Sequence, residues 1–331
     1  MKDIVWWAEN FFRIITLDKG LTTIKLYPKQ KELLNFIVGN NRICLLSCRQ
    51  TGKTTTYTVF ALWLATLFKD KKILICANKL ATAIDIMNRI RKAYEELPFW
   101  IKPGILSYAK GGIEFSNGSS IKAFSTSSSG ARGSSAGTLI LDEFAFVPKN
   151  VADEFFASVM PIVSSSKKSK IIMVSTPNGA SGKFYEIWQS ANAKDIGANA
   201  EGWQPFRINW WEVPGRDEEW KAQKIASEGM QVWQQEYECS FLVSSSIHKL
   251  IPDEVIQKYR QKQAELKTSG ASVGKKQTIM AESGDKLYEF TVWHEFKKNH
   301  TYIASGDISE GVGGDSSVLY VWDVTDLSNI T

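Results

Sequence analysis

The pattern of apolar and polar positions predicts a chain in which short strands alternate with helices. Apolar runs with the length of buried strands lie at residues 43–47, 72–77, 138–141 and 170–175. Helical spacing is found at 30–38, 54–68, 81–97 and 150–159, and roughly also at 6–15. Such alternation is typical of a mainly parallel sheet with helical crossovers, so the expected fold class is α/β.

The remaining pattern predicts a hairpin and a change of texture near the end. Residues 112–125 contain two apolar segments around Asn117-Gly118, a strong turn signal. After Phe241, residues 261–285 are rich in Lys, Gln, Ser and Gly and predict a linker or exposed insertion. Strands are expected at 288–292, 301–307 and 317–324. The last two do not bury a core alone, so they either complete the first sheet or begin a second domain.

Composition excludes several classes of protein. With 44% hydrophobic and 23% charged residues, the chain is neither disordered nor of low complexity. The longest apolar run, residues 59–68, is about half of the ~20 residues that a membrane-spanning helix needs, and residues 1–10 do not resemble a secretory signal. The four cysteines have no CxxC spacing, which argues against zinc or a disulfide framework and fits a reducing cytoplasm.

Charge is unevenly distributed along the chain. Residues 1–250 carry a net charge of +8 and residues 251–331 one of −3. A basic body suggests a polyanionic partner, and an acidic end suggests cation binding. Ordinary surface charge explains the same numbers, so charge alone does not decide between them.

The segment Ser47–Thr54, SCRQTGKT, fits the P-loop pattern except that Ser47 replaces the first Gly. A predicted strand precedes it and a predicted helix follows, so backbone N–H groups and the helix N-terminus would surround phosphates. Lys53 would reach the β- and γ-phosphates, and the Thr54 hydroxyl would bind Mg²⁺. The predicted nucleotide-binding residues within this segment and just after it are Ser47, Arg49, Gln50, Thr51, Gly52, Lys53, Thr54 and Thr55.

Two adjacent acids, Asp142 and Glu143, end the strand at 138–141. Charged carboxylates at such a place need a partner or a metal, because desolvating them is costly. Asp142 would hold Mg²⁺, and Glu143 would orient and activate the attacking water. About 90 residues after a P-loop, this pair indicates nucleoside triphosphate hydrolysis.

Other candidates are weaker when only the residues are considered. Ser175-Thr176-Pro177 ends a strand and can sense a phosphate, but a simple turn explains it better. Arg132, in a Gly/Ser-rich loop, is either an arginine finger or a surface residue, and Arg49 is a second candidate for phosphate contact. Asp307 and Asp315 flank a Gly-rich turn, and on their own they read as an acidic turn, because a two-metal nuclease needs more carboxylates.

Taken together, the segments resemble the large terminase subunit of tailed bacteriophages, particularly of T-even-like myoviruses. The order and spacing of many pieces carry this resemblance, where no single motif would. The matching pieces are FFRIITLDKG, LYPKQKELL, SCRQTGKTT, ELPFWIKPGI, NGSSIKAFSTS, ARGSSAGTLILDEFAF, SKIIMVSTPNG, KFYEIW, WQQEYECSF and YIASGDISEGVGGDSSVLYVWDVTD.

The resemblance implies an additional-strand P-loop ATPase that uses ATP and Mg²⁺ to pump double-stranded DNA through a portal into an empty capsid. It also implies an RNase H-like nuclease that uses Mg²⁺ or Mn²⁺ to cut concatemeric DNA. The expected division is an ATPase domain at 1–243, a linker at 244–299 and the start of the nuclease at 300–331. The expected partners are the portal protein, the small terminase subunit and further copies in a ring, a pentamer by resemblance. The expected location is the host cytoplasm, transiently at the procapsid portal, outside the mature virion and away from membranes.

Residue roles carry over position by position. Gln30 resembles the adenine-contacting Gln, and Arg49, Lys53, Asp142 and Glu143 match the P-loop basic residues, the metal-shell acid and the catalytic acid. The resemblance assigns Ser175-Thr176-Pro177 to nucleotide coupling and Arg132 to a finger acting on the neighbouring subunit. Asp307 matches the first nuclease carboxylate; because the family's later carboxylates are absent, we expect that this chain does not cut DNA.

Two other functions compete with a packaging motor. A helicase-like or remodelling ATPase would separate strands, and it predicts a second ATPase-like lobe for which the chain has no room. A scaffold that binds nucleotide without hydrolysing it would lack the water-positioning acid, whereas Glu143 is present.

Overall fold

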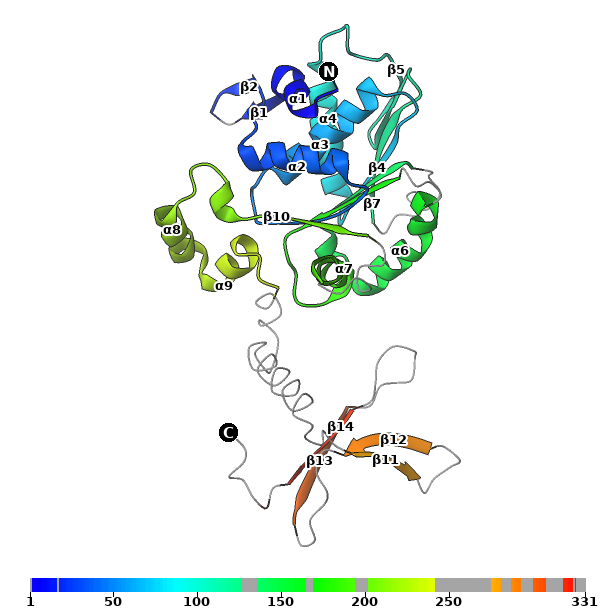
Figure 1. Cartoon of the computed structure of the whole chain (residues 1–331), viewed down its shortest axis with the longest axis vertical. Coiled ribbons are helices and arrows are strands. Elements are labelled where there is room, and N and C mark those ends of the chain that lie inside the picture. The colour runs from blue at the N-terminus through cyan, green and yellow to red at the C-terminus, as the bar shows by residue number, and fades with distance from the viewer. Residues whose placement is uncertain are drawn as a thin grey trace. The chain divides into compact units, whose positions relative to one another are not determined.

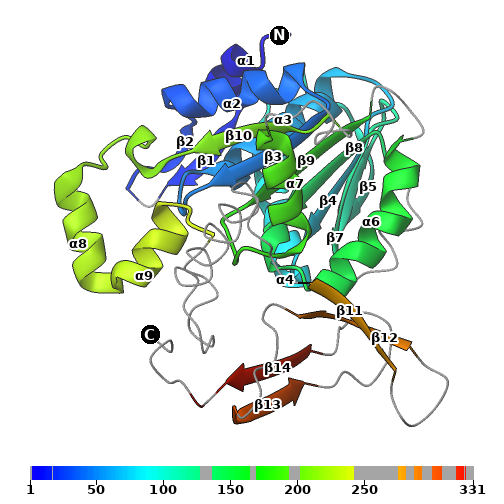
Figure 2. The same cartoon turned by 60° about the horizontal axis from the view of Figure 1, so that its bottom comes forward.

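The computed structural model describes two compact units, residues 1–253 and 254–331. The described residues are 2–16, 18–126, 136–164, 169–193, 202–241, 275–280, 287–292, 300–307, 318–323 and 325. The first unit contains a large twisted sheet with helices on both faces, and the second contains two pairs of antiparallel strands (Figures 1 and 2). The described helices include none that is long and apolar enough to cross a bilayer.

An eight-stranded sheet forms the centre of the first unit, in the order β10-β3-β9-β8-β4-β7-β6-β5. The first six strands in this order are parallel, and β6 and β5 continue it antiparallel. Strand β9 lies between the P-loop strand β3 and the acid-bearing strand β8, as the additional-strand class requires. The strands are β3 (Arg42–Ser47), β4 (Lys72–Ala77), β5 (Ile105–Ala109), β6 (Gly112–Phe115), β7 (Ser120–Ser125), β8 (Thr138–Asp142), β9 (Lys170–Ser175) and β10 (Gln204–Ile208).

Alternate residues of the central strands pack on opposite faces, which divides the core in two. Ile43 and Leu45 of β3 face one cluster, whereas Cys44 and Leu46 face the other. The first cluster is covered by α1 (Ile4–Phe11), α2 (Pro28–Gly39), α3 (Lys53–Leu67) and α4 (Leu80–Glu95). The second is covered by α6 (Lys149–Ser164) and α7 (Gly182–Asn192). This arrangement, visible in Figure 2, confirms the predicted α/β fold class.

A group of small helices follows β10. It consists of η2 (Trp210–Glu212), α8 (Glu218–Glu228), α9 (Met230–Val232) and the π-helix η3 (Trp233–Tyr237), and we call residues 209–239 the helical subdomain. Its core is aromatic. The centre of the Trp220 ring lies 5.8 Å from the centre of the Trp233 ring and 5.3 Å from that of the Tyr237 ring. Glu238 accepts hydrogen bonds from the indoles of both Trp210 and Trp233.

The structure differs from the sequence prediction at the N-terminus. The helical spacing at 6–15 divides into α1, which ends at Phe11, and β1 (Arg13–Thr16), which pairs with β2 (Gly20–Thr23). Asp3 starts α1 by accepting hydrogen bonds from the N–H groups of Val5 and Trp6. Two consecutive β-branched residues, Ile14 and Ile15, favour the strand over a continued helix.

The predicted hairpin at 112–125 is confirmed by β6 and β7, which pair antiparallel. The sequence did not predict strands β5 and β10 or helices α7 and α8. The predicted linker at 261–285 contains β11 (Lys275–Met280), which pairs with β12 (Leu287–Val292), so this stretch is not entirely unstructured. Strand β11 begins with three polar residues, Lys275, Lys276 and Gln277, which gave no strand signal in the sequence, and it pairs with β12.

In the second unit, β13 (Tyr302–Asp307) pairs antiparallel with β14 (Val318–Asp323), which confirms the two predicted strands. Whether they belong to an RNase H-like domain stays a prediction, as does a domain boundary at residue 243.

Candidate nucleotide-binding site

Four parallel strands of the central sheet end at one edge and bring distant segments together. Ser175 of β9 pairs in register with Leu46 of β3, and Asp142 of β8 pairs with Val174 of β9 and Ala77 of β4. The segment Cys48–Gly52, here called the phosphate loop, follows β3 and leads into α3. The carboxyl ends of parallel strands are where α/β proteins bind ligands.

Ser47 occupies the position where the P-loop pattern has Gly, and the local geometry accommodates it. Its side chain is buried, and its hydroxyl lies 2.6 Å from the Thr51 hydroxyl. This hydrogen bond joins the start of the loop to a residue near its end. Gln50 and Gly52 have positive φ values of 59° and 70°. The loop is therefore a tight turn that ends on the first residue of α3, Lys53.

Gln30 packs directly against this loop. Its Nε2 donates to the Thr51 carbonyl at 3.4 Å, and its Oε1 accepts from the Tyr27 N–H at 3.3 Å. A Cβ at Gly52 would lie 2.5 Å from the same Nε2, so a larger residue would displace the Gln30 amide, and the φ of 70° also favours glycine at this position. Gln30 thus supports the loop from α2, and its predicted contact with adenine stays a prediction.

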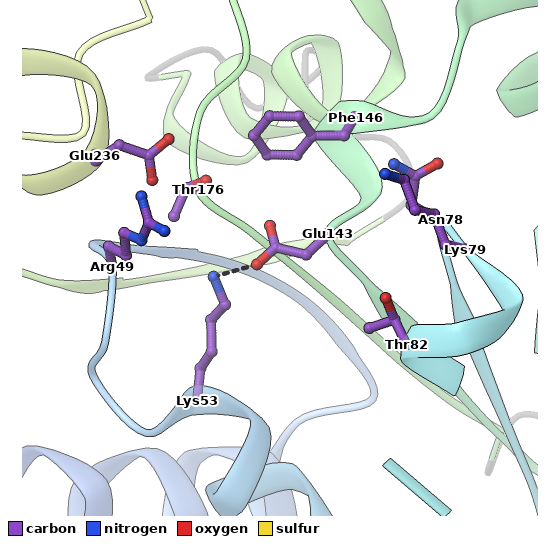
Figure 3. Close-up of a pocket in the computed structure, with 9 residues that line it drawn as sticks. All are labelled: Arg49, Lys53, Asn78, Lys79, Thr82, Glu143, Phe146, Thr176 and Glu236. Carbon is purple, nitrogen blue, oxygen red and sulfur yellow. Dashed lines mark ion pairs between the residues drawn. The ribbon is translucent and has the colours of Figure 1, made fainter. Parts of the chain in front are cut away.

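Lys53 and Glu143 form the central ion pair of the site. Lys53 Nζ lies 2.7 Å from Glu143 Oε1, and the lysine side chain is 11% exposed (Figure 3). Glu143 has a left-handed backbone (φ 52°), which turns its side chain out of the line of β8. Ser175 donates to Glu143 Oε2 at 3.4 Å and accepts from the Ala145 N–H at 3.2 Å. The acid therefore contacts both the P-loop lysine and the end of β9.

Asp142 is buried beside this pair and 2% exposed. Burial, together with the charge of Glu143, raises the pKa of its carboxyl to about 6, while Lys53 opposes the rise. Among the residues that the structure describes, its Oδ1 has no hydrogen-bond partner. A buried carboxylate oxygen with a free lone pair is the kind of ligand that Mg²⁺ takes, so the residues present fit the predicted metal. The described residues contain no cluster of three or more His, Cys, Asp or Glu that could hold a metal ion.

The raised pKa of Asp142 gives a prediction about stability. Between pH ~4 and 6 the folded protein binds more protons than the unfolded chain, so stability falls as pH rises through this window. A shift of about two pKa units corresponds to about 3 kcal/mol. Without nucleotide or metal, we expect Asp142→Asn to be more stable than wild type at pH 8, with the difference vanishing near pH 4. Chemical denaturation at both pH values measures this difference in stability. Equal stabilities at pH 8 would show that the buried, ionised Asp142 carboxylate does not destabilise the fold.

A cavity of about 370 Å³ opens over these groups (Figure 3). Of the predicted site residues, Arg49, Lys53, Glu143 and Thr176 line it. Ser47, Thr51, Asp142 and Ser175 are buried in the loop and strand ends around it, and Thr54 and Thr55 lie in the first turn of α3. The structure thus brings the predicted phosphate-binding and acidic residues together at one cavity.

Five further lining residues escaped the sequence prediction: Asn78, Lys79, Thr82, Phe146 and Glu236. Asn78 and Lys79 directly follow β4, so their place at a strand end was a usable signal. Glu236 lies on the π-helix, and its carboxylate and the Arg49 guanidinium point toward one another in Figure 3. Burial raises the pKa of Glu236, and its carbonyl accepts the Arg49 N–H at 2.7 Å.

The other predicted residues lie elsewhere. Arg132 and Asp315 fall outside the described residues. Asp307 is the last residue of β13, in the second unit. The structure therefore describes the setting of the ATP-related residues and leaves the finger and the nuclease carboxylates as predictions.

Comparison with known proteins agrees with this architecture. A family model described as terminase large subunit, T4-like virus type, N-terminal, matches residues 44–258. The large terminase ATPase domain of Thermus phage P74-26 superimposes with a TM-score of 0.52 at 21% identity, covering 66% of this chain and 100% of that one. An arginine-to-alanine mutant of the same domain gives 0.53 at 20% identity, covering 66% and 94%.

The bacteriophage HK97 large terminase is similar over more of this chain. It superimposes with a TM-score of 0.53 at 14% identity and covers 93% of this chain, which in turn spans 62% of the HK97 protein. At these identities the structural matches establish a shared fold. The family match, which spans well over half of the sequence and includes the phosphate loop and both acids, goes further: this chain belongs to the large terminase subunits of the T4-like virus type.

Proposed function

We propose that this chain is an ATP-driven motor subunit that translocates double-stranded DNA through a portal into a viral procapsid. The observation that carries the proposal is the Lys53–Glu143 pair at the end of β8, inside a cavity formed by the phosphate loop of a terminase-family chain. A lysine for the phosphates and an acid for the attacking water are the two groups that hydrolysis needs closest to the γ-phosphate.

The geometry supports a defined role for each side chain. The loop amides and Lys53 bind the phosphates, and Arg49, at the cavity wall, adds positive charge. Phosphate oxygens replace Glu143 as the partner of Lys53, which leaves Glu143 to accept a hydrogen bond from the attacking water and to orient it. Asp142 and Thr54 would hold Mg²⁺, which neutralises charge that develops on the phosphates.

The contacts of the segment Ser175-Thr176-Pro177 support its proposed coupling role. Ser175 touches Glu143, and the Pro177 carbonyl accepts a hydrogen bond from Gln235 of η3 at 3.2 Å. Two hydrogen bonds, one between Glu143 and Ser175 and one between Pro177 and Gln235, therefore connect the acid to the helical subdomain. π-Helices are frequent at functional sites, which fits a position where nucleotide state moves the chain.

The remaining assignments are extensions of the same proposal. Copies of the chain form a ring, a pentamer, on the portal, where the small terminase subunit delivers DNA and Arg132 of one copy serves the site of its neighbour. The chain works in the host cytoplasm and leaves before the virion matures. Asp307, with Asp315 nearby in sequence, contributes to a metal-dependent nuclease.

Steady-state ATP hydrolysis with and without double-stranded DNA tests the motor proposal. We expect turnover that rises with DNA, and DNA binding that weakens steeply with salt because phosphate contacts release counterions. Heparin at equal charge is the control for a general polyanion effect. Strand separation would favour a helicase, and tight ATP binding without turnover, even with portal and DNA, would favour a scaffold.

A further inference from the structure

Three successive carbonyls of the phosphate loop are held by side chains from outside the loop. Arg216 donates from Nη1 to the Arg49 carbonyl at 3.1 Å and from Nη2 to the Gln50 carbonyl at 2.8 Å. The Thr51 carbonyl accepts from the Tyr27 hydroxyl at 2.5 Å and from Gln30. Two segments far apart in sequence, the start of α2 with its N-cap Tyr27 and the segment before α8, thus donate to consecutive carbonyls of the loop.

Holding a carbonyl also aims an amide. In a trans peptide the C=O of one residue and the N–H of the next point in opposite directions, and the described chain has no cis peptide. The carbonyls of Arg49, Gln50 and Thr51 point toward their side-chain donors. The N–H groups of residues 50, 51 and 52 must therefore point away from those donors.

Arg216 is itself fixed. Its guanidinium carbon lies 4.6 Å from the centre of the Trp220 ring, within the aromatic core of the helical subdomain. Its backbone N–H donates to the Val213 carbonyl at 3.3 Å, and Asp217, the next residue, caps α8 by accepting from the Trp220 N–H at 2.8 Å. A planar fork that is stacked on an indole presents its two donors in one fixed orientation.

In the described part of the chain, Arg216 is not one of the residues that line the cavity. It bonds to the carbonyl side of the loop, whereas Lys53 and Arg49 reach the cavity itself. Its Nη1 also lies 3.5 Å from the sulfur of Cys48, the first residue of the loop. A guanidinium placed so acts through the backbone of the loop.

From these contacts we infer that Arg216 is a positioning residue for nucleotide binding: it orients the loop amides toward the phosphates and ties the loop to the helical subdomain. The inference rests on the nucleotide binding proposed above and specifies what holds its phosphate-binding backbone in place. The helical subdomain then helps to orient the amides that follow the Arg49 and Gln50 carbonyls, and Arg216 does so without lining the cavity.

A series of nucleotides separates this role from a purely structural one. We expect Arg216→Ala to weaken binding of ATP and ADP about 10-fold or more, the magnitude typical of lost charge-assisted hydrogen bonds, and to leave AMP binding nearly unchanged. Arg216→Lys keeps the charge without the fork, so it restores affinity only in part. Isothermal titration of each nucleotide with the full chain measures these effects.

The matched control is Arg91→Ala. Arg91 also donates to a backbone carbonyl, that of Ala109, and lies over the Tyr108 ring, but it belongs to α4 beside the antiparallel strands β5 and β6. We expect this variant to bind all nucleotides like wild type. Equal losses for AMP, ADP and ATP in Arg216→Ala would reduce Arg216 to a structural contact, and full rescue by lysine would show that charge alone matters.

Amide hydrogen exchange tests the same inference without nucleotide. In the nucleotide-free full chain, Arg216→Ala should speed exchange at residues 49–52 relative to wild type and to Arg91→Ala, while the core strand β8 keeps its protection. Unchanged exchange in the loop would overturn the inference. If wild type binds no ATP, the proposed function fails, and this experiment still decides whether Arg216 orders the loop.

Discussion

Replacing Glu143 by Gln is expected to lower ATP turnover by about 10²–10⁴-fold while leaving ATP binding intact. The amide keeps the size of the side chain and its hydrogen bonding to Ser175, but it does not accept a proton from water. The substitution also removes the negative partner of Lys53, which lies 2.7 Å away. In the variant, Lys53 does not have to break an ion pair with a carboxylate before it binds phosphate. We therefore expect the Kd for ATP to stay equal or fall.

Single-turnover hydrolysis and nucleotide titration measure the two effects separately. Glu114→Gln provides a matched control, because Glu114 pairs with Lys122 at 2.8 Å in the antiparallel part of the sheet, away from the cavity. It breaks a similar ion pair and should leave turnover unchanged. Wild-type turnover in Glu143→Gln would remove Glu143 from the mechanism and with it the assignment of the acid pair.

The central strands of the fold were predictable because their physics is local. Strands β3, β4, β8 and β9 are buried on both faces, so they appear as continuous apolar runs with polar ends. Strand β10 was not predictable, since Pro205 and Arg207 interrupt its apolar pattern; it lies at the edge of the sheet, and among the described strands it pairs with β3 alone. Its strand character comes from that partner and not from its own residues.

The site residues also divide into those that the local sequence predicts and those that it does not. The phosphate loop and the acid pair are contiguous motifs, so their chemistry could be recognised from adjacent residues. Arg216, Gln235 and Glu236 reach the site only because the aromatic core of the helical subdomain packs beside the sheet. Nothing in their local sequence indicates this, since an arginine before a helix and two polar residues among aromatics are common surface patterns.

Replacing Lys53 by Ala is expected to abolish turnover and to weaken ATP binding by about 10²-fold or more, because the β- and γ-phosphates lose their charge-assisted partner. A second effect concerns the protein without nucleotide. Glu143 loses its counter-ion next to the buried Asp142, and the pKa of Asp142, which Lys53 holds down, rises further. We expect a loss of about 1–3 kcal/mol in the free energy of unfolding at pH 8.

The double variant Lys53→Ala/Glu143→Gln separates these two effects. Removing both charges leaves no unpaired carboxylate at position 143, so most of the lost stability should return, whereas ATP affinity should stay as low as in Lys53→Ala. Chemical denaturation and nucleotide titration of the four proteins in this cycle measure both. If stability and affinity recovered together, the lysine would act mainly by neutralising Glu143; if neither the single nor the double variant lost affinity, Lys53 would not bind phosphate. The expected split places the two functions of one lysine at two stages, as the counter-ion of the catalytic acid before ATP arrives and as the phosphate ligand afterwards.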